Sequence, residues 1–148
     1  MKLNYYVYNN EAIACCVLLM VLEKVKEIDY ARLLLILPYL LDDRNISFLN
    51  KNKKVSIDFF LKKNNIYYNF NNRYLSLLPV TINSLIILSE MNLINFNRDG
   101  NICLISMDSC ECVVSKRLLE IEKAIPILLD TILNYSTEYL YLNSGVEL

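Results

Sequence analysis

Few side chains in this 148-residue sequence are of the types that enzymes use for acid–base or nucleophilic chemistry. The chain contains no histidine, which is the usual general base at neutral pH and the usual partner of a cysteine nucleophile. The remaining acidic candidates are Asp42 with Asp43, Asp108 with Glu111, and Glu120 with Glu122. Neighbours in sequence point in different directions, and residues two apart do not share a helix face. We therefore expect that the protein is not an enzyme.

Glycines and cysteines do not indicate a cofactor site either. Gly100 and Gly145 are the only glycines, so no glycine-rich phosphate loop exists and any ATP must be bound by another chain. Cys110 and Cys112 are spaced C-x-C, and Cys103 is the nearest further ligand candidate. A structural zinc site requires a second ligand pair, which the sequence does not supply. We expect reduced cysteines and no cofactor.

The charge pattern argues against a protein that binds nucleic acid by itself. The formal net charge is −1, so the chain has no broad basic field to hold phosphates. Lys51, Lys53 and Lys54 form its one basic cluster, within a segment from 45 to 54 that we expect to be a polar loop. A solvated turn is our main interpretation of this cluster, and a set of phosphate contacts is the alternative.

The composition favours a subunit that stays associated with other chains. Hydrophobic residues make up 55% of the sequence and charged residues 21%, which gives more apolar surface than one small core readily hides. The first residues lack the apolar core of a secretory signal. The apolar run 12–22 is shorter than a membrane-spanning helix, which needs about 20 residues. We expect a cytoplasmic protein that does not enter a membrane.

The spacing of apolar residues predicts a mainly helical chain. Asn10 is a good N-cap for a helix over 11–27, and Asp29 for a leucine-rich helix that Pro38 kinks or restarts. The first of these helices is apolar on every side, so we expect part of its contact to come from another chain. Further helices are predicted over 55–63, 66–78 (closed by Pro79), 81–91, 115–133 (broken or bent at Pro126) and 136–142 (capped by Gly145).

The stretch INFNRDGNICLI, residues 94–105, predicts a β-hairpin, because Asp99-Gly100 suits the positive φ of a tight turn. Two helices, a tight connection at Pro79, a third helix and this two-stranded wing follow the order of a winged helix-turn-helix. The predicted fold is mainly α with a small β-hairpin, in one domain over 1–148. N-terminal helices at 11–54 pack on a winged-helix-like unit at 55–106, and C-terminal helices follow at 115–148.

The helix before the wing has few of the side chains that read bases in a major groove, Asn83 and Asn92 alone. Base readout uses Arg, Lys, Asn or Gln, with cations nearby for the phosphates. Residues 80–92 contain no lysine or arginine, and the one cation of the wing, Arg98, is offset by Asp99. We therefore expect this unit to contact protein rather than DNA.

Three blocks of the sequence carry a resemblance to a known family. They are YNNEAIACCVLL, LLLILPYLLDDR and RYLSLLPVTINSLIILSEMNLI, the last followed by the wing. In order and spacing they resemble the middle components of the three-component ABC ATPase systems of bacteria, which include Lamassu-type defence. The similarity covers residues 9–105 and, less clearly, 136–146.

The resemblance implies a non-catalytic adaptor between an SMC- or Rad50-like ATPase and an effector, often a nuclease, that acts against phage, plasmid or host. Such a chain would meet DNA only indirectly, through the complex. Leu37, Pro38, Arg44 and Arg73 match the motifs of the family and are candidate partner contacts. The alternative is that these residues have only structural roles. Leu37 and Pro38 would then be a core residue and the site of a helix kink, and the two arginines would be surface charges or helix caps. Ile94, Phe96 and Arg98 of the wing complete the set of candidates.

Two other functions remain open at this point. One is a winged-helix DNA-binding protein or transcriptional regulator, resting on the order of the elements and on Lys51, Lys53, Lys54 and Arg98. The other is a homodimeric regulator that uses the apolar helix at 12–22 as its seam.

Overall fold

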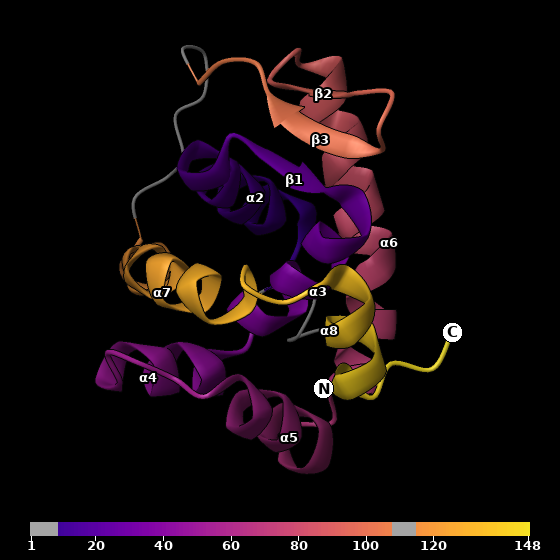
Figure 1. The fold of residues 1–148 in the computed structure, drawn as a ribbon. Helices are drawn as coiled ribbons and strands as arrows, with labels where there is room; N and C mark the ends of the chain where they lie inside the picture. The colour runs from indigo at the N-terminus through magenta and orange to yellow at the C-terminus, as the bar shows by residue number, and fades with distance from the viewer. Residues whose placement is uncertain (1–8, 108–114) are drawn as a thin grey trace.

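The computed structural model describes residues 9–107 and 115–148, and these ranges form seven helices and three short strands (Figure 1). The elements are α2 (Glu11–Val25), β1 (Glu27–Asp29), α3 (Tyr30–Leu40), α4 (Asp43–Lys51), α5 (Ile57–Tyr67), α6 (Phe70–Glu90), β2 (Ile94–Phe96), β3 (Asn101–Leu104), α7 (Lys116–Ile132) and α8 (Thr137–Ser144). The expected class, mainly helical with a small β element, is confirmed.

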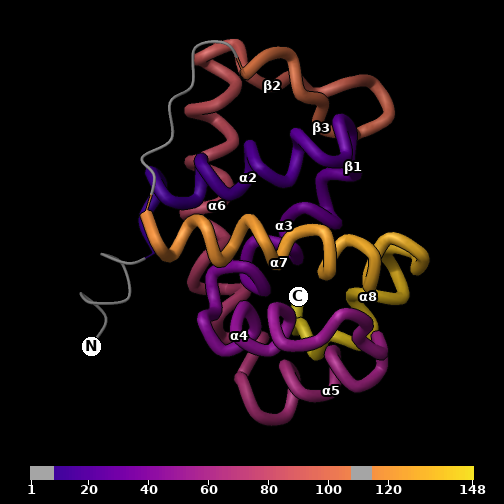
Figure 2. Tube along the Cα trace, turned by 90° about the vertical axis from the view of Figure 1, so that its left-hand side faces the viewer, coloured from indigo at the N-terminus to yellow at the C-terminus, as the bar shows by residue number. Residues whose placement is uncertain are grey.

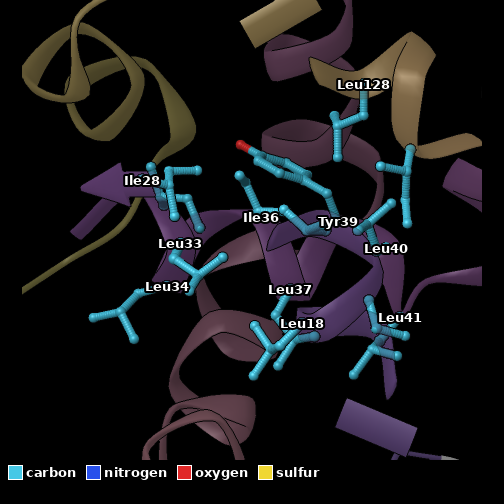
Figure 3. Packing of buried hydrophobic residues seen from close by; sticks show 14 of the residues in the cluster. Leu18, Ile28, Leu33, Leu34, Ile36, Leu37, Tyr39, Leu40, Leu41 and Leu128 are labelled. Atoms are coloured by element: carbon cyan, nitrogen blue, oxygen red, sulfur yellow. The ribbon is translucent and has the colours of Figure 1, made fainter. Parts of the chain in front are cut away.

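Helix α3 lies at the centre of the fold. Asp29 caps it by accepting a hydrogen bond from the Ala31 amide at 3.2 Å, and every residue from 33 to 40 is buried. Five other helices, α2, α4, α6, α7 and α8, pack around it. Figure 3 shows its leucines among side chains that include Leu18 of α2 and Leu128 of α7. Each buried leucine contributes roughly 1.5–3 kcal/mol, so this helix makes a large contribution to the stability of the core.

Aromatic rings close one end of this core. The Tyr39 ring stacks on Phe70 with ring centres 4.2 Å apart, and Phe60 lies 5.0 Å away. All three side chains are fully buried. They join α3 to the start of α6 and to α5, and so hold these two helices against α3.

The helix α2 is covered largely by its own chain. It lies against α6 and α7 (Figure 2), and Ala14, Val17, Leu18, Leu19, Val21 and Leu22 are buried. Its apolar run therefore does not require another chain to cover it, and little of it remains for a homodimer seam.

Among the residues described, we find no helix with the length and hydropathy needed to cross a bilayer.

The prolines do not end helices where the sequence predicted. Helix α6 is 21 residues long and continues through Pro79, so the expected break between residues 78 and 81 is wrong. An interior proline costs about 3 kcal/mol, but Leu77, Leu85 and Leu88 on the same helix are buried and outweigh this loss. Helix α7 also continues past Pro126, and α3 ends at Leu40 shortly after Pro38 without a restart.

Residues 43–51 are a helix, so the predicted polar loop over 45–54 is wrong for most of its length. The Asp42 side chain caps α4 by accepting from the Arg44 amide at 2.9 Å. Ile46 and Leu49 are buried, and α4 packs against α7. These two buried residues, three positions apart, are enough to hold this short helix in place because α7 packs against them.

The predicted hairpin is confirmed as β2 and β3, but it is part of a three-stranded antiparallel sheet in the order β1-β3-β2. Strand β1 was not predicted; it pairs Ile28 with Ile102 of β3. The Asn97 side chain closes the turn by accepting from the amides of Asp99 and Asn101, both at 3.0 Å. The winged helix-turn-helix is not confirmed, since its second and third helices are the single helix α6.

Tyr39 offers a test of this core. Its hydroxyl is buried and has no hydrogen-bond partner among the described residues, and burial raises its pKa well above the ordinary value. An unsatisfied buried donor costs about 1–3 kcal/mol. We predict that Tyr39→Phe raises the free energy of unfolding by about 1 kcal/mol in urea titrations.

Tyr74→Phe is the matched control, because the Tyr74 hydroxyl lies 3.3 Å from that of Tyr141. This control is expected to leave stability unchanged or to lower it. A loss of stability in Tyr39→Phe as large as in the control would contradict the packing described.

Candidate functional site

Three of the four residues that match the family motifs, Pro38, Arg44 and Arg73, lie around the buried side chain of Asp42 or bond to the residue that binds it. The Asp42 carboxylate, 4% exposed, accepts from Arg44 at 2.6 Å and from Arg73 at 2.8 Å. Arg73 also donates to the carbonyl of Pro38 and to the side chain of Asn64, both at 2.8 Å. This arginine therefore ties the end of α3 to α5 and to the first turn of α6.

The same cluster sets the ionisation of Asp42. Burial opposes the charged form, but the hydrogen bond from Arg44 and the charges of Arg73 and Arg44 outweigh it and lower the pKa below its ordinary value of 3.8. A lowered folded-state pKa means that the stabilising contribution is complete above about pH 4 and is lost as the pH falls through the lowered value. The cluster is therefore intact at neutral pH.

Most of the candidate contacts taken from the family motifs lie inside the molecule. Leu37 and Pro38 are buried in α3, and the Arg73 side chain is only 11% exposed. The Arg44 side chain is 52% exposed and lies over the Tyr68 ring at 4.2 Å. Of these four residues, only Arg44 offers a partner a substantial surface in the free chain.

The three candidate residues of the wing also differ in how far they are exposed. Ile94 is buried, whereas Phe96 is 50% exposed and Arg98 is exposed in the turn. The Phe96 ring lies 6.2 Å from that of Tyr30 at the start of α3. The sheet thus presents Phe96 at the surface beside Tyr30.

Helix α6 carries an outward apolar stripe that the sequence analysis did not single out. Leu75, Pro79, Ile82 and Ile86 are spaced four, three and four residues apart and are all exposed. Three of them are large hydrophobic side chains, 46%, 38% and 51% exposed for Leu75, Ile82 and Ile86. Such spacing places side chains along one face of a helix. We call these four residues the α6 stripe.

A hollow lies at one end of the stripe. It has a volume of about 340 Å³ and is lined by Tyr30, Ile82, Leu85, Ile86, Phe96 and Gly100. None of these side chains is charged, so the hollow is suited to an apolar side chain from another molecule. The α6 stripe and this hollow together form a continuous apolar surface, which is the candidate functional site.

The acidic and thiol groups do not assemble into a second candidate site within the described ranges. Asp43 pairs with Arg117 at 3.0 Å, and Lys123 pairs with Glu120 at 2.9 Å and lowers its pKa. Residues 9–107 and 115–148 contain no cluster of three or more potential metal ligands. Burial, and then Glu27, raise the pKa of the free Cys103 thiol. Asp108, Cys110, Glu111 and Cys112 lie outside the described residues.

One signal in the sequence would have found the stripe. The spacing of Leu75, Pro79, Ile82 and Ile86 is that of alternating d and a positions in a heptad. It is masked by the buried face of the same helix, whose Leu77, Leu85 and Leu88 give an equally apolar pattern. A helix that is apolar on two faces is readily interpreted as wholly buried.

The fold and this surface define a small, mainly helical protein with an outward apolar face on α6. The profile of the family described as "ABC-three component (ABC-3C) system Middle Component 3" matches residues 5–128. The chain therefore belongs to this family of middle components, and membership in a three-component system implies further subunits. No curated protein and no solved structure matches the chain. The expected membership in the three-component ABC systems is confirmed, whereas the match does not extend to the Lamassu type.

The buried cluster generates a stability prediction. Removing one partner of a buried ion pair costs about 3–5 kcal/mol, so Arg73→Met should lower the free energy of unfolding by about 3 kcal/mol. Arg44→Met is the matched control, because Arg44 binds the same carboxylate from a half-exposed position. It should cost less than about 1 kcal/mol.

Chemical denaturation of both variants checks this difference. Equal losses from the two substitutions, or a negligible loss from Arg73→Met, would show that Arg73 does not hold the fold together. Its role would then have to be sought at the surface.

Proposed function

We propose that this chain is the non-catalytic adaptor of its three-component system. In this role it joins an SMC- or Rad50-like ABC ATPase to an effector such as a nuclease, in bacterial defence against phages or plasmids. A Lamassu-type system is the finer assignment suggested by the sequence blocks. The observation that carries the proposal is the α6 stripe with its adjoining hollow, an apolar surface that the core does not use.

The energetics support a docking role for this surface. Full burial of an isoleucine or leucine is worth roughly 1.5–3 kcal/mol, so covering the exposed parts of Leu75, Ile82 and Ile86 recovers roughly 1 kcal/mol from each. Filling the hollow beside Phe96 adds a buried anchor of the kind that dominates protein interfaces. Together these gains suit a specific subunit contact.

The spacing of the stripe indicates the kind of segment that would cover it. Side chains at d and a positions of a heptad insert between those of a second helix. We therefore expect an amphipathic helix of the ATPase or of the effector to lie along α6. DNA is a poor occupant, because residues 80–92 carry no lysine or arginine.

Co-expression with the ATPase and effector encoded beside this chain tests the proposal. We predict that the double substitution Ile82→Glu with Ile86→Glu weakens binding to one of these subunits at least tenfold, measured by calorimetry or quantitative pull-down. Both positions are exposed, so thermal unfolding of the free chain should change little.

Leu119→Glu is the control for introducing charge at an exposed hydrophobic residue, since Leu119 is 45% exposed on α7, which lies on the other side of the molecule from α6 (Figure 1). It should bind as the unaltered chain does. The proposal is wrong if the unaltered chain ignores both subunits, or if the double variant binds as well as this control.

A further inference from the structure

One segment of this chain carries a net positive charge. Residues 44–73 hold seven of the 15 lysines and arginines but one of the 16 acids, a net charge of +6, whereas the other residues together carry −7. The seven cations are Arg44, Lys51, Lys53, Lys54, Lys62, Lys63 and Arg73. Helices α4 and α5, which contain most of this segment, lie at the opposite end of the molecule from the three-stranded sheet (Figure 1).

Five of these cations are not used by the fold for ion pairs. Arg44 and Arg73 bind Asp42. Lys51, Lys53, Lys54, Lys62 and Lys63 form no ion pair with any carboxylate in the described part of the chain. The single acid of the segment, Asp58, accepts a hydrogen bond from Tyr139 of α8 at 2.7 Å. These five lysines therefore remain available to an anionic partner.

Aromatic rings lie among the lysines. The Phe48 ring of α4 and the Phe59 ring of α5 are 5.8 Å apart, centre to centre. The Lys63 ammonium lies 4.0 Å from the centre of the Phe48 ring and 5.9 Å from that of Phe59. Phe59 is 56% exposed, so one flat ring faces solvent next to the cations. We call Phe48, Lys51, Lys53, Lys54, Phe59, Lys62 and Lys63 the basic surface.

We infer that the basic surface binds single-stranded nucleic acid without sequence preference. Sites of that kind combine a positive surface for the phosphates with exposed aromatic rings on which bases stack. Exposed Lys51, Lys53, Lys54 and Lys62 face the phosphates, and Phe59 stacks on a base. This function is separate from the proposed adaptor role, since it uses other residues at another end of the fold. It replaces the expectation that the chain meets DNA only through its partners.

The exposed aromatic ring favours a nucleic acid over the other anionic partners. A helix that lies on a membrane needs a broad apolar face below its cations, whereas α5 has Lys62 and Lys63 between Phe59 and Ile66 on its exposed side. An acidic protein segment would satisfy the lysines but would leave the exposed ring without a stacking partner. A nucleic-acid strand satisfies both features.

Fluorescence anisotropy with the full chain and a labelled 20-nucleotide oligothymidylate tests the inference. Four phosphate contacts give a slope of about −3 in log K against log salt for a single strand. We therefore expect binding at 50 mM salt that weakens roughly 50-fold at 200 mM. Lys53→Gln with Lys62→Gln should reduce affinity and flatten this slope.

Two further variants test the stacking contact and the location of the binding surface. Phe59→Ala should weaken binding by roughly fivefold or more, the effect of one lost stacking contact, and leave the salt slope unchanged. Lys24→Gln with Lys26→Gln removes the same charge from exposed positions near the end of α2 and should bind as the unaltered chain does.

Several outcomes would overturn the inference. These are no binding at 50 mM salt, equal losses from the two lysine pairs, and duplex DNA bound as tightly as the single strand with no effect of Phe59→Ala. Tighter binding to phosphatidylserine vesicles or to polyglutamate than to the oligonucleotide would assign the surface to a membrane or to an acidic protein instead.

Discussion

The structure depends on the burial of α3 on every side. Its residues 33–40 are enclosed by α2, α4, α6, α7 and α8, so the other helices must meet around a short leucine-rich segment. This arrangement also covers α2, although the composition suggested that so small a chain would need other chains to hide its apolar helices. The core is therefore closed within the chain. The apolar side chains that remain on α6 face outward without a role in that core, which makes them meaningful as a docking surface.

The ion pair of Asp42 with Arg73 fixes how α5 and the first turn of α6 pack against the end of α3. It lies where α3 ends, and Arg73 reaches from the first turn of α6 to Pro38 and Asn64. Pro38 and Arg73, two of the residues that match the family motifs, thus serve the geometry of the fold. A buried charge pair adds little net stability compared with apolar packing, but it specifies one arrangement because any other leaves a charge unpaired.

Local signals in the sequence predicted local structure. Asn10 and Asp29 cap helices as expected, Gly145 ends α8 with a φ of 75°, and the turn near Gly100 forms the hairpin. Features that depend on distant partners were missed. Strand β1 exists because β3 lies beside it, α4 is helical because α7 packs on it, and α6 survives Pro79 because its other face is buried. For the lysines at 51, 53 and 54 the sequence favours a solvated turn, with phosphate contacts as the alternative. Phe59 and Lys63 of α5 meet Phe48 of α4 only in the folded chain, so the sequence did not connect them with these lysines.

The central claim is that the core of the free chain is complete and that α6 is its docking face. Hydrogen–deuterium exchange on the free chain, and on the chain purified with the other subunits of its three-component system, tests both parts at once. The account predicts that amides of α3 are equally protected in the two samples, and that residues 75–90 of α6 and strand β2 exchange more slowly only in the complex. Rapid exchange of α3 in the free chain, or unchanged exchange of α6 in the complex, would contradict it.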